Sequence, residues 1–465
     1  MASAIIPTRR VQTLHRREPK TDARYVLYWM QAAQRAEFNH ALELAAQRAN
    51  ELGLPLVVGF GLTDRYPETN LRHKTFLVQG LRDAAHALRR RGVALVVRLG
   101  EPDDVALDLA EHAAEVVTDR GYLRHQKRWR RRVADEAGVP VTQVETDVCV
   151  PVDVVTDKQE HAARTIRPRI HRHLEDFLVE LRTTPLDRPS LDLDVASTGE
   201  DVDDVDALLG KLDLDTSVPA SPLFTGGTGE AKRRFRRFLD DHFDDYADHR
   251  NQPQTSDTSH MSPYLHYGHV SPVWLVLEAR EAKRQGKNID AFVEELVVRR
   301  ELAINFVHFC DGYDRYDDAV PAFAQKTLAE HADDPREHTY TRDEFEAAET
   351  HDPYWNAAMR EARDTGYMHN YMRMYWGKKI IEWSDTPKAA FDHMLGIMNR
   401  YYLDGRDPNS YTGVAWCFGL HDRGWTEREV FGKVRYMNAK GLERKCDIQA
   451  YVSKVERLSE QAAQA

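Results

Sequence analysis

The stretches RYVLYWM (24–30), EFNHALELAAQRANEL (37–52) and LPLVVGF (54–60) follow one another near the start of the chain. The first and third are nearly continuous apolar runs, which are typical of parallel strands buried on both faces. The middle stretch repeats apolar residues at helical spacing. The alternation continues in three further apolar runs, VALVVRL (93–99), AEVVTD (114–119) and VTQVE (141–145). We therefore predict an α/β domain with a Rossmann-like parallel sheet over residues 23–150.

The rest of the chain predicts a different organisation. Residues 226–465 carry long helical patterns with little strand-like alternation, which indicates an all-α domain. Residues 151–225 are rich in Pro, Asp and Thr and lack a clear period, so we expect an interdomain linker there. Residues 1–22 are predicted to form a flexible N-terminal arm.

Composition excludes several classes of protein. A net charge of −11 argues against nonspecific coating of nucleic acid, which needs clustered Lys and Arg. No apolar run approaches the roughly 18 residues that a membrane helix needs, and no signal peptide is evident, so we expect a cytoplasmic protein. The four cysteines are widely spaced and no metal-ligand pattern occurs, which favours reduced thiols and no metal site.

A run of small hydroxyl residues precedes Pro263. Thr258, Ser259 and Ser262 lie in TSDTSHMSP, just before an expected helix. Hydroxyls and free backbone N–H groups at such a place can hold a phosphate. The same pattern also serves as an ordinary helix N-cap, and the residues alone leave both interpretations open.

A polar clamp can be assembled from two distant segments. Asn370 and Arg373 lie one helical turn apart, and the later loop supplies Asp404, Asp407 and Asn409. A buried arginine needs an acidic partner, so an Arg373–Asp404 pair could hold a ring with hydrogen-bonding edges. A purely structural ion pair is the alternative.

Tryptophans recur on two expected helices. Trp376 and Trp383 are seven residues apart, about two helical turns, and Trp355 lies on the preceding helix. Indoles at this spacing usually form core packing, but they also suit electron hopping beside a redox cofactor. Glu295 lies on an apolar helix, where a carboxylate needs a partner or a ligand.

Basic and aromatic residues alternate near the C-terminal end. The segment 421–445 combines several Arg and Lys residues with Trp425 and Tyr436, a mixture suited to phosphates and exposed bases. The segment RHQKRWRRR (124–132) is strongly basic as well, but on a helix of the first domain it is more often a solvated face.

Taken together, five segments resemble class II cyclobutane pyrimidine dimer (CPD) photolyases of the photolyase/cryptochrome family. These segments are TSHMSPYLHYGHVSP (258–272), EELVVRREL (294–302), MHNYMRMYWGKKIIEW (368–383), LDGRDPNSYTGVAW (403–416) and FGKVRYMN (431–438). Their order and spacing match as well, and the resemblance covers nearly the whole chain. It implies light-dependent repair of pyrimidine dimers by electron transfer from reduced, anionic FAD to a flipped lesion.

The resemblance also implies roles for individual residues. FAD would be held by Tyr246, Thr258, Ser259, His260, Met261, Ser262, Asn370, Arg373, Asp404, Asp407 and Asn409. Electrons would pass through Trp376 nearest the flavin, then Trp355, then Trp383. The lesion pocket would contain the catalytic residues Glu295, Met374 and Trp416. Contacts to DNA would come from Arg250, Trp425 and Arg435.

The implied partner is UV-damaged DNA that contains pyrimidine dimers, and a monomer is expected. An antenna chromophore, either a deazaflavin or a folate, is possible in the first domain. The chain departs from the family pattern at Met398, where an Asn near flavin N5 is expected, and at Arg299, where some members have a second pocket Trp.

Other functions compete with repair. A cryptochrome would use the same flavin pocket to sense blue light, but Glu295, Met374 and Trp416 together favour repair. A non-photochemical flavoprotein or a DNA-binding module without turnover is a third possibility, and a colourless purified protein would favour the module.

Overall fold

The computed structural model describes residues 6–283 and 286–464, and over these residues it contains a six-stranded sheet in the order β1-β6-β5-β2-β3-β4. Neighbouring strands from β6 to β4 run parallel, and β1 pairs with β6 in the antiparallel sense. The strands are β1 (Val11–His15), β2 (Tyr25–Trp29), β3 (Leu56–Leu62), β4 (Ala94–Leu99), β5 (Ala113–Asp119) and β6 (Val141–Val144). The parallel sheet is thus confirmed.

Helices cover this sheet and explain its apolar strands. Every residue of β2, β3 and β5 is buried, as expected for strands packed on both faces. The covering helices are α1 (His40–Leu52), α2 (Leu71–Arg90), α3 (Pro102–Ala110) and α4 (Arg124–Glu136). The chain passes from β2 to β3 on one side and later returns to β5 on the other side of β2. Ligands of open α/β sheets bind at the carboxyl ends of strands beside such a reversal.

Of the flexible arm predicted for residues 1–22, residues 1–5 lie outside the described residues, and residues 8–15 form structure instead. The turn η1 (Thr8–Arg10) leads into β1, which pairs with β6 from Val11↔Val144 onward. Arg10 is buried, and its guanidinium donates hydrogen bonds to the carbonyl oxygens of Glu145, Val148 and Cys149. These contacts hold residues 8–15 against β6. Without this pairing, the backbone groups on the outer side of β6 would have no strand partner.

The predicted linker, residues 151–225, also contains more structure than expected. It forms α5 (Val152–Val155), α6 (Ala163–Phe177), the turn η2 (Asp194–Thr198) and α7 (Val205–Leu209). Helix α6 forms despite Pro168 because its apolar face, including Ile170 and Leu174, is buried in a hydrophobic cluster of the helical domain. Further along, Glu200 N donates to Val97 O at 2.7 Å, so the acidic segment runs beside β4.

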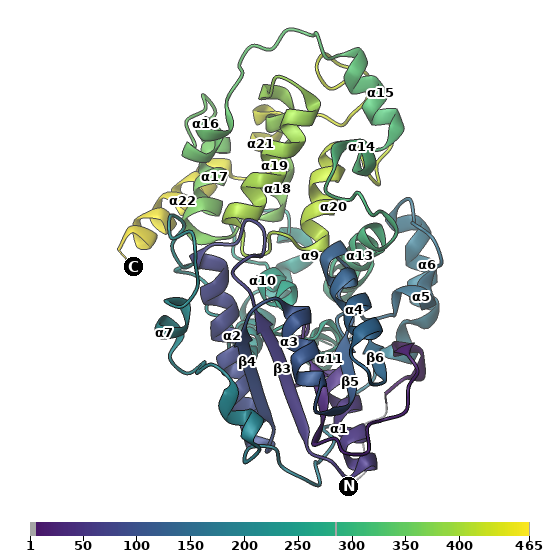
Figure 1. Cartoon of the computed structure of the whole chain (residues 1–465). Coiled ribbons are helices and arrows are strands. Elements are labelled where there is room, and N and C mark those ends of the chain that lie inside the picture. Colours follow the sequence, from purple (N-terminus) through teal and green to yellow (C-terminus); the bar gives the residue numbers. More distant parts are fainter. Residues whose placement is uncertain (1–5, 284–285, 465) are drawn as a thin grey trace.

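The remaining helices form the second domain. They are α8 (Thr228–Asp241), η3 (Phe243–Asp245), α9 (Tyr246–His249), α10 (Ser262–His266), α11 (Pro272–Lys283), α12 (Lys287–Val293), the π-helical turn η4 (Glu294–Arg299), α13 (Arg300–Phe309), α14 (Tyr316–Ala319), α15 (Ala322–Glu330), α16 (Arg342–Ala347), α17 (Pro353–Thr365), α18 (Asn370–Trp383), α19 (Pro387–Tyr401), α20 (Pro408–Cys417), α21 (Ala439–Lys445) and α22 (Ile448–Ala463). In Figure 1, α15 to α21 lie above the sheet, whereas α11 lies at the height of the sheet.

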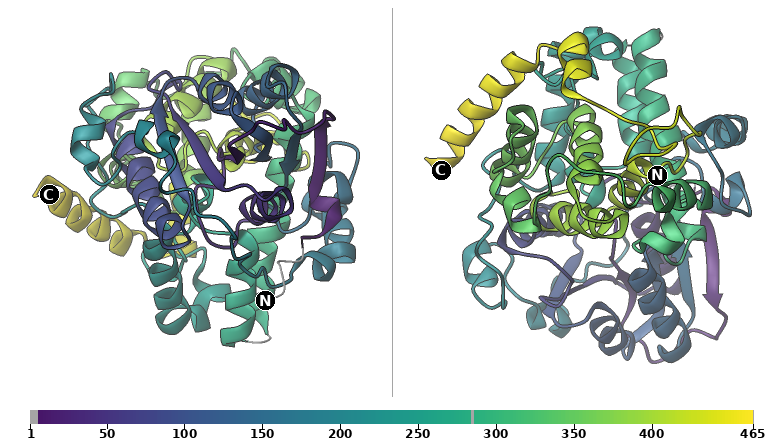
Figure 2. Two further views of the ribbon diagram at one scale, coloured as in Figure 1. Left: turned by 60° about the horizontal axis from the view of Figure 1, so that its bottom comes forward. Right: turned by 90° about the horizontal axis from the view of Figure 1, so that it is seen from above.

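Two hydrophobic clusters hold this domain together. One is centred on α17, α18 and α19, and the other contains α6, α8, α11 and η4. The C-terminal helix α22 packs on α17 and projects at the edge of the molecule in both views of Figure 2. Among the helices of the described chain, none is long and apolar enough to cross a membrane.

Candidate active site

A cavity lies in the helical domain, and all the residues predicted to hold the cofactor line it. These are Tyr246, Thr258, Ser259, His260, Met261, Ser262, Asn370, Arg373, Asp404, Asp407 and Asn409. They come from α9, from the loop before α10 and its first residue, from α18, and from the loop before α20 and the first turn of that helix. The fold therefore brings together segments that are up to 163 residues apart in the chain, from Tyr246 to Asn409.

The predicted clamp between Arg373 and Asp404 is present. Arg373 Nη2 donates hydrogen bonds to both carboxylate oxygens of Asp404, at 3.1 and 2.9 Å. Burial opposes the charge of Arg373, but the neighbouring Asp404 outweighs burial and raises the pKa of the guanidinium. The Arg373 guanidinium also lies 4.7 Å from the ring centre of Tyr402. The Arg373 guanidinium is thus charged, hydrogen-bonded to Asp404 and packed against an aromatic ring.

The loop before α10 supplies the polar wall. His260 has a left-handed backbone (φ 53°), a conformation that costs energy for a non-glycine residue. Its Nδ1 is buried without a hydrogen-bond partner, and burial lowers the pKa of the imidazole to about 3, so the ring is neutral. A neutral ring with a free nitrogen, beside the hydroxyls of Thr258 and Ser259, fits a polar cofactor in the cavity.

Asp407 contributes a carboxylate to the lining of the cavity. Its carboxylate accepts hydrogen bonds from the backbone N and side-chain Nδ2 of Asn409, both at 2.8 Å, and caps α20. His266 Nδ1 lies 3.2 Å from the other oxygen. Burial works against ionisation, but the His266 hydrogen bond and nearby cations lower the pKa of Asp407 overall. Asp407 therefore stays an anion that can accept further hydrogen bonds.

The π-helical turn η4 presents charged residues to the mouth of the cavity. A π-turn inserts an extra residue into a helix and is common at functional sites. Here both Glu295 and Arg299 line the cavity, and Arg250, the residue after α9, binds Glu295 at 2.5 Å. The neighbouring Glu294 pairs with Arg167 at 2.8 Å and with Arg299 at 3.0 Å. These pairs fix the direction of η4.

The other predicted pocket residues lie around this mouth. Met374 lines an adjoining cavity together with Arg435, and the two cavities share Asn370. Trp416 is not among the lining residues of either, but Arg299 stacks over its indole at 5.5 Å. The departure at Arg299 thus forms a cation–π contact with Trp416.

The three predicted electron-transfer tryptophans form a continuous chain. The rings of Trp376 and Trp355 are stacked, with centroids 6.4 Å apart and planes at 11°. Trp355 then meets Trp383 edge to face at 6.0 Å. All three are buried, and the ring of Tyr402, which the Arg373 guanidinium contacts, lies 6.1 Å from that of Trp376. Trp355 therefore lies between Trp376 and Trp383, as a relay in the order 376, 355, 383 would require.

Trp425 and Arg435 lie together on the surface. Trp425 is 39% exposed, and the guanidinium groups of Arg435 and Arg423 lie 5.0 and 5.4 Å from its ring centre. An exposed indole flanked by cations suits contact with bases and phosphates. This face adjoins the mouth of the cavity through Arg435.

Asn399, next to the departure at Met398, turns away from the cofactor cavity. Its side chain donates to Glu68 at 2.5 Å and accepts from the backbone N of Arg406 at 3.1 Å. Met398 packs in the hydrophobic core. The lining of the cofactor cavity, as described, includes neither residue. Asn399 therefore connects the helical domain to the first domain.

Sequence reasoning missed Tyr367 and Arg300 as cavity residues. The ring of Tyr367 lies 4.7 Å from that of His260, and the Arg373 guanidinium lies 5.8 Å from its centre. Arg300 lines the cavity and donates to Asp147 O at 2.6 Å. Tyr367 directly precedes the family-like segment 368–383, and Arg300 lies within the segment 294–302. Their places in these segments could have identified them as cavity residues.

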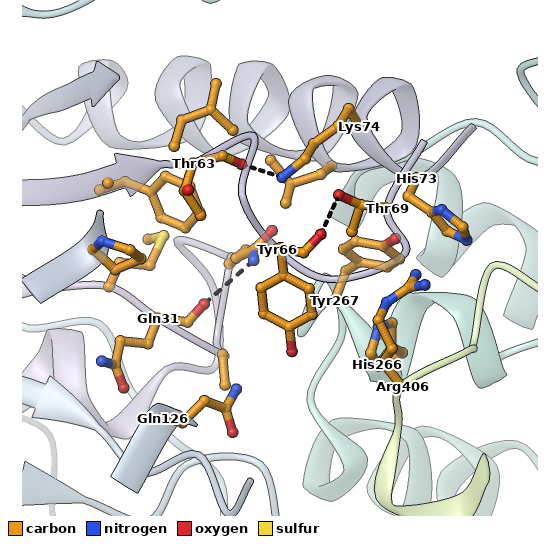
Figure 3. A pocket seen from close by; sticks show the side chains of 18 of the residues that line it. Gln31, Thr63, Tyr66, Thr69, His73, Lys74, Gln126, His266, Tyr267 and Arg406 are labelled. Carbon is orange, nitrogen blue, oxygen red and sulfur yellow. Dashed lines mark hydrogen bonds between the residues drawn. The ribbon is translucent and has the colours of Figure 1, made fainter. Parts of the chain in front are cut away.

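A second cleft lies between the domains at the carboxyl ends of β2 and β3. Figure 3 shows Gln31 and Tyr66 of the first domain on one side, and His266, Tyr267 and Arg406 of the helical domain on the other. The lining is mostly apolar, and Gln31 Nε2 is buried without a partner. No cluster of residues able to hold a metal ion occurs in the described part of the chain.

Comparison with known proteins gives consistent matches. Residues 26–190 match the family model described as DNA photolyase. The deoxyribodipyrimidine photo-lyase of Methanothermobacter thermautotrophicus is 49% identical over 457 residues, which cover 98% of this chain and 100% of that protein. The protein of the same name from Potorous tridactylus is 36% identical over 92% of this chain and 81% of its own length.

Solved structures share the fold at low sequence identity. A Synechocystis cryptochrome superposes with a TM-score of 0.69 at 16% identity, covering 94% of this chain and 87% of its own. An archaeal photolyase from Sulfolobus tokodaii, described with two FAD molecules, gives a TM-score of 0.68 at 16% identity over 92% of this chain and 89% of its own.

Proposed function

Since the chain belongs to the photolyase/cryptochrome family, we propose that it repairs cyclobutane pyrimidine dimers in UV-damaged DNA with light and reduced FAD. One observation carries most weight. The cavity with the Arg373–Asp404 clamp has Glu295 at its mouth, and the Trp376–Trp355–Trp383 chain begins on the same helix, α18. Binding groups, a candidate lesion contact and an electron route therefore converge on one site.

The residues of the cavity fit FAD. Its hydroxyl and backbone groups around Thr258, Ser259 and Ser262 would bind the diphosphate, and Asn370, Asp404 and Asp407 would bind the ribityl and ring edges. Arg373 would place a positive charge beside the ring, which favours an anionic reduced state. Reduced FAD bound there would supply, on illumination, the single electron that splits the dimer.

Glu295 would act on the lesion. In its protonated form its carboxyl group can donate a hydrogen bond to a pyrimidine carbonyl, where negative charge develops after the electron arrives. Such a preorganised donor is most effective where water is excluded. Trp416, held by Arg299, would form an aromatic wall for the flipped bases. Arg250, now bound to Glu295, would turn to a DNA phosphate.

The DNA would be bound by residues around the mouth of the cavity. Trp425 and Arg435 would fill the gap that a flipped dimer leaves in the duplex. The net charge of −11 does not oppose this binding, because the required cations are gathered locally.

The interdomain cleft would hold a second, light-harvesting chromophore, a deazaflavin or a folate. The cleft lies where ligands bind in this sheet topology, and Gln31 Nε2, Gln34 Oε1 and Arg406 Nη2 are buried there without partners. Unpartnered polar atoms in a mostly apolar cleft favour a ring ligand with polar edges.

A direct assay tests the proposal. Purified protein, with its FAD chemically reduced, is mixed with an oligonucleotide that contains one thymine dimer and is illuminated with blue light. We expect loss of the dimer at a rate proportional to light intensity, and none in the dark. Intact dimers after illumination of fully reduced protein would refute repair. If such protein still photoreduced its FAD, a cryptochrome-type photoreceptor would be the better assignment.

A further inference from the structure

A second cavity, of ≈ 740 Å³, opens directly beside the interdomain cleft. The two share Thr63, Tyr66, Trp129 and Arg406 in their linings, so they form one continuous depression. We call the outer part the basic vestibule, after the cations along it, which are Arg65, Arg124, Lys127, Arg128, Arg131 and Arg406. Most of them belong to the segment RHQKRWRRR at the start of α4.

Several of these cations have no counter-ion. Among the residues that the structure describes, Arg65, Arg128 and Arg131 contact no carboxylate, and all three are exposed toward solvent. Their neighbour Arg132 behaves differently, because it pairs with Asp103 at 2.9 Å and lies outside the vestibule. The segment is thus divided into a neutralised face and a face with free positive charge.

Acidic residues also line the vestibule, and most of them accept a hydrogen bond from a neighbouring side chain. Glu68, Glu101, Asp311 and Asp314 line the vestibule. Arg124 donates to Asp314 at 2.9 Å, and Glu68 accepts from Asn399. Thr63 donates to Glu101 at 2.8 Å. The neutral donors Asn399 and Thr63 leave Glu68 and Glu101 charged, but the six cations that line the vestibule still outnumber its four carboxylates by two.

Arg406 connects the vestibule to the inner cleft. It is buried, with 3% of its surface exposed, and has a left-handed backbone (φ 64°). Its Nη1 donates to the carbonyl oxygens of Glu68 and Asn399, and its Nη2 has no partner among the described residues. A buried guanidinium without a carboxylate is costly, and a strained backbone that maintains it indicates a ligand contact. Figure 3 shows Arg406 beside Tyr267 and His266 at the cleft.

We propose that the basic vestibule binds the anionic tail, phosphate or carboxylate, of a ligand whose ring occupies the interdomain cleft. This inference rests on the second-chromophore proposal above and adds the ligand's class: a ring with a charged tail. Arg406 would hold the junction of ring and tail, and Arg128 and Arg131 the far end. Guanidinium groups are well suited to both anions because they donate paired hydrogen bonds.

A duplex bound at the vestibule fits the observations less well. The carboxylates of Glu68, Glu101 and Asp311 lie among the cations and would repel a continuous row of phosphates. A single flexible tail can pass between them. Arg406 is buried within the depression, where a backbone phosphate of a duplex would not reach it.

The test compares ligands that share a ring and differ in the tail. Full-length protein is titrated with a ribityl-5-deazaflavin and with the same deazaflavin carrying a phosphate- and carboxylate-bearing tail, and binding is followed by ligand fluorescence. Folates with one or with several glutamates are compared in the same way. We expect the tailed form of the ring that binds to be favoured about tenfold at low salt, with the preference falling as salt is added.

Variants locate the effect. R128Q/R131Q should remove the preference for the tail while leaving the affinity of the tailless ligand unchanged, and the matched variant R132Q should keep the preference. Equal affinity for tailed and tailless ligands overturns the inference but leaves the second chromophore intact. Failure of both rings to bind in any form overturns both proposals. A drop in affinity for undamaged duplex DNA in R128Q/R131Q, without a change in ligand preference, would assign the vestibule to DNA.

Discussion

Arg250 Nη1 donates a hydrogen bond to Oε1 of Glu295 at 2.5 Å, across the mouth of the cofactor cavity. Both side chains are about one-third exposed. In the protein without DNA, Glu295, which is proposed to contact the lesion, is therefore hydrogen-bonded to Arg250, which is proposed to contact the DNA backbone. A DNA phosphate that attracts Arg250 would free Glu295 once DNA is bound.

Glu295→Ala should lower the repair yield several-fold while FAD remains bound, because the charge that develops on the pyrimidine loses its hydrogen-bond donor. Arg250→Ala should instead weaken DNA binding and spare the yield of bound complexes. The measurement is repair per absorbed photon at saturating DNA, alongside DNA affinity. An unchanged yield in Glu295→Ala would remove its proposed role.

Trp376→Phe should block photoreduction of oxidised FAD but spare repair by chemically reduced protein. The chain of stacked rings is interrupted at its cofactor end, whereas the lesion side of the cavity is untouched. Transient absorption of the flavin measures the first effect. The matched control is Trp274→Phe, in the other hydrophobic cluster, which should photoreduce normally. Normal photoreduction in Trp376→Phe would refute the hopping chain.

Asp404→Asn should destabilise the protein and reduce its FAD content. Removing one partner of a buried ion pair leaves an uncompensated charge and typically costs about 3–5 kcal/mol. Urea unfolding and the flavin absorbance of purified protein measure the two effects. Lys388→Gln, which breaks the exposed pair with Asp317, should change neither appreciably. Full FAD occupancy in Asp404→Asn would show that the clamp is only structural.

Glu301 should make stability depend on pH. It is buried, its carboxylate accepts from Cys149 N and Val150 N, and burial raises its pKa to about 7 despite nearby Arg300 and Arg10. The folded state therefore keeps a proton that the unfolded state loses near its ordinary pKa of 4.5. The stabilisation this provides is complete below that value and is lost as pH rises toward about 7.

Glu301→Gln should accordingly weaken the dependence of the unfolding free energy on pH. Between pH 5 and pH 8 the wild type should lose up to about 3 kcal/mol more unfolding free energy than the variant. Urea titrations at several pH values measure the difference. Glu330→Gln, at an exposed position, should follow the wild type. Parallel curves for wild type and Glu301→Gln would contradict the assignment.

The sheet and the cofactor cavity were predictable for different reasons. Apolar runs such as 24–30 and 54–60 must be buried on both faces, and this requirement alone indicates parallel strands. The cavity residues came from the family resemblance, since nothing in the spacing of Tyr246 and Asn409 shows that they meet.

Features decided by tertiary contacts were not predictable. The strand β1 is only partly buried and forms because β6 has an available side. Helix α6 contains a proline, and the burial of Ile170 and Leu174 outweighs its helix-breaking tendency. The orientation of Glu294 depends on Arg167, which lies in the segment predicted as a linker.

The path of the acidic segment beside β4 has a consequence for solubility. β4 is the last strand of the sheet, and its unpaired backbone groups would otherwise offer a template to another molecule. The backbone N–H of Glu200 donates to one of these groups, the carbonyl oxygen of Val97. The surrounding carboxylates repel similar chains. The connection between the domains thus also protects the edge strand β4 from pairing with an edge strand of another molecule.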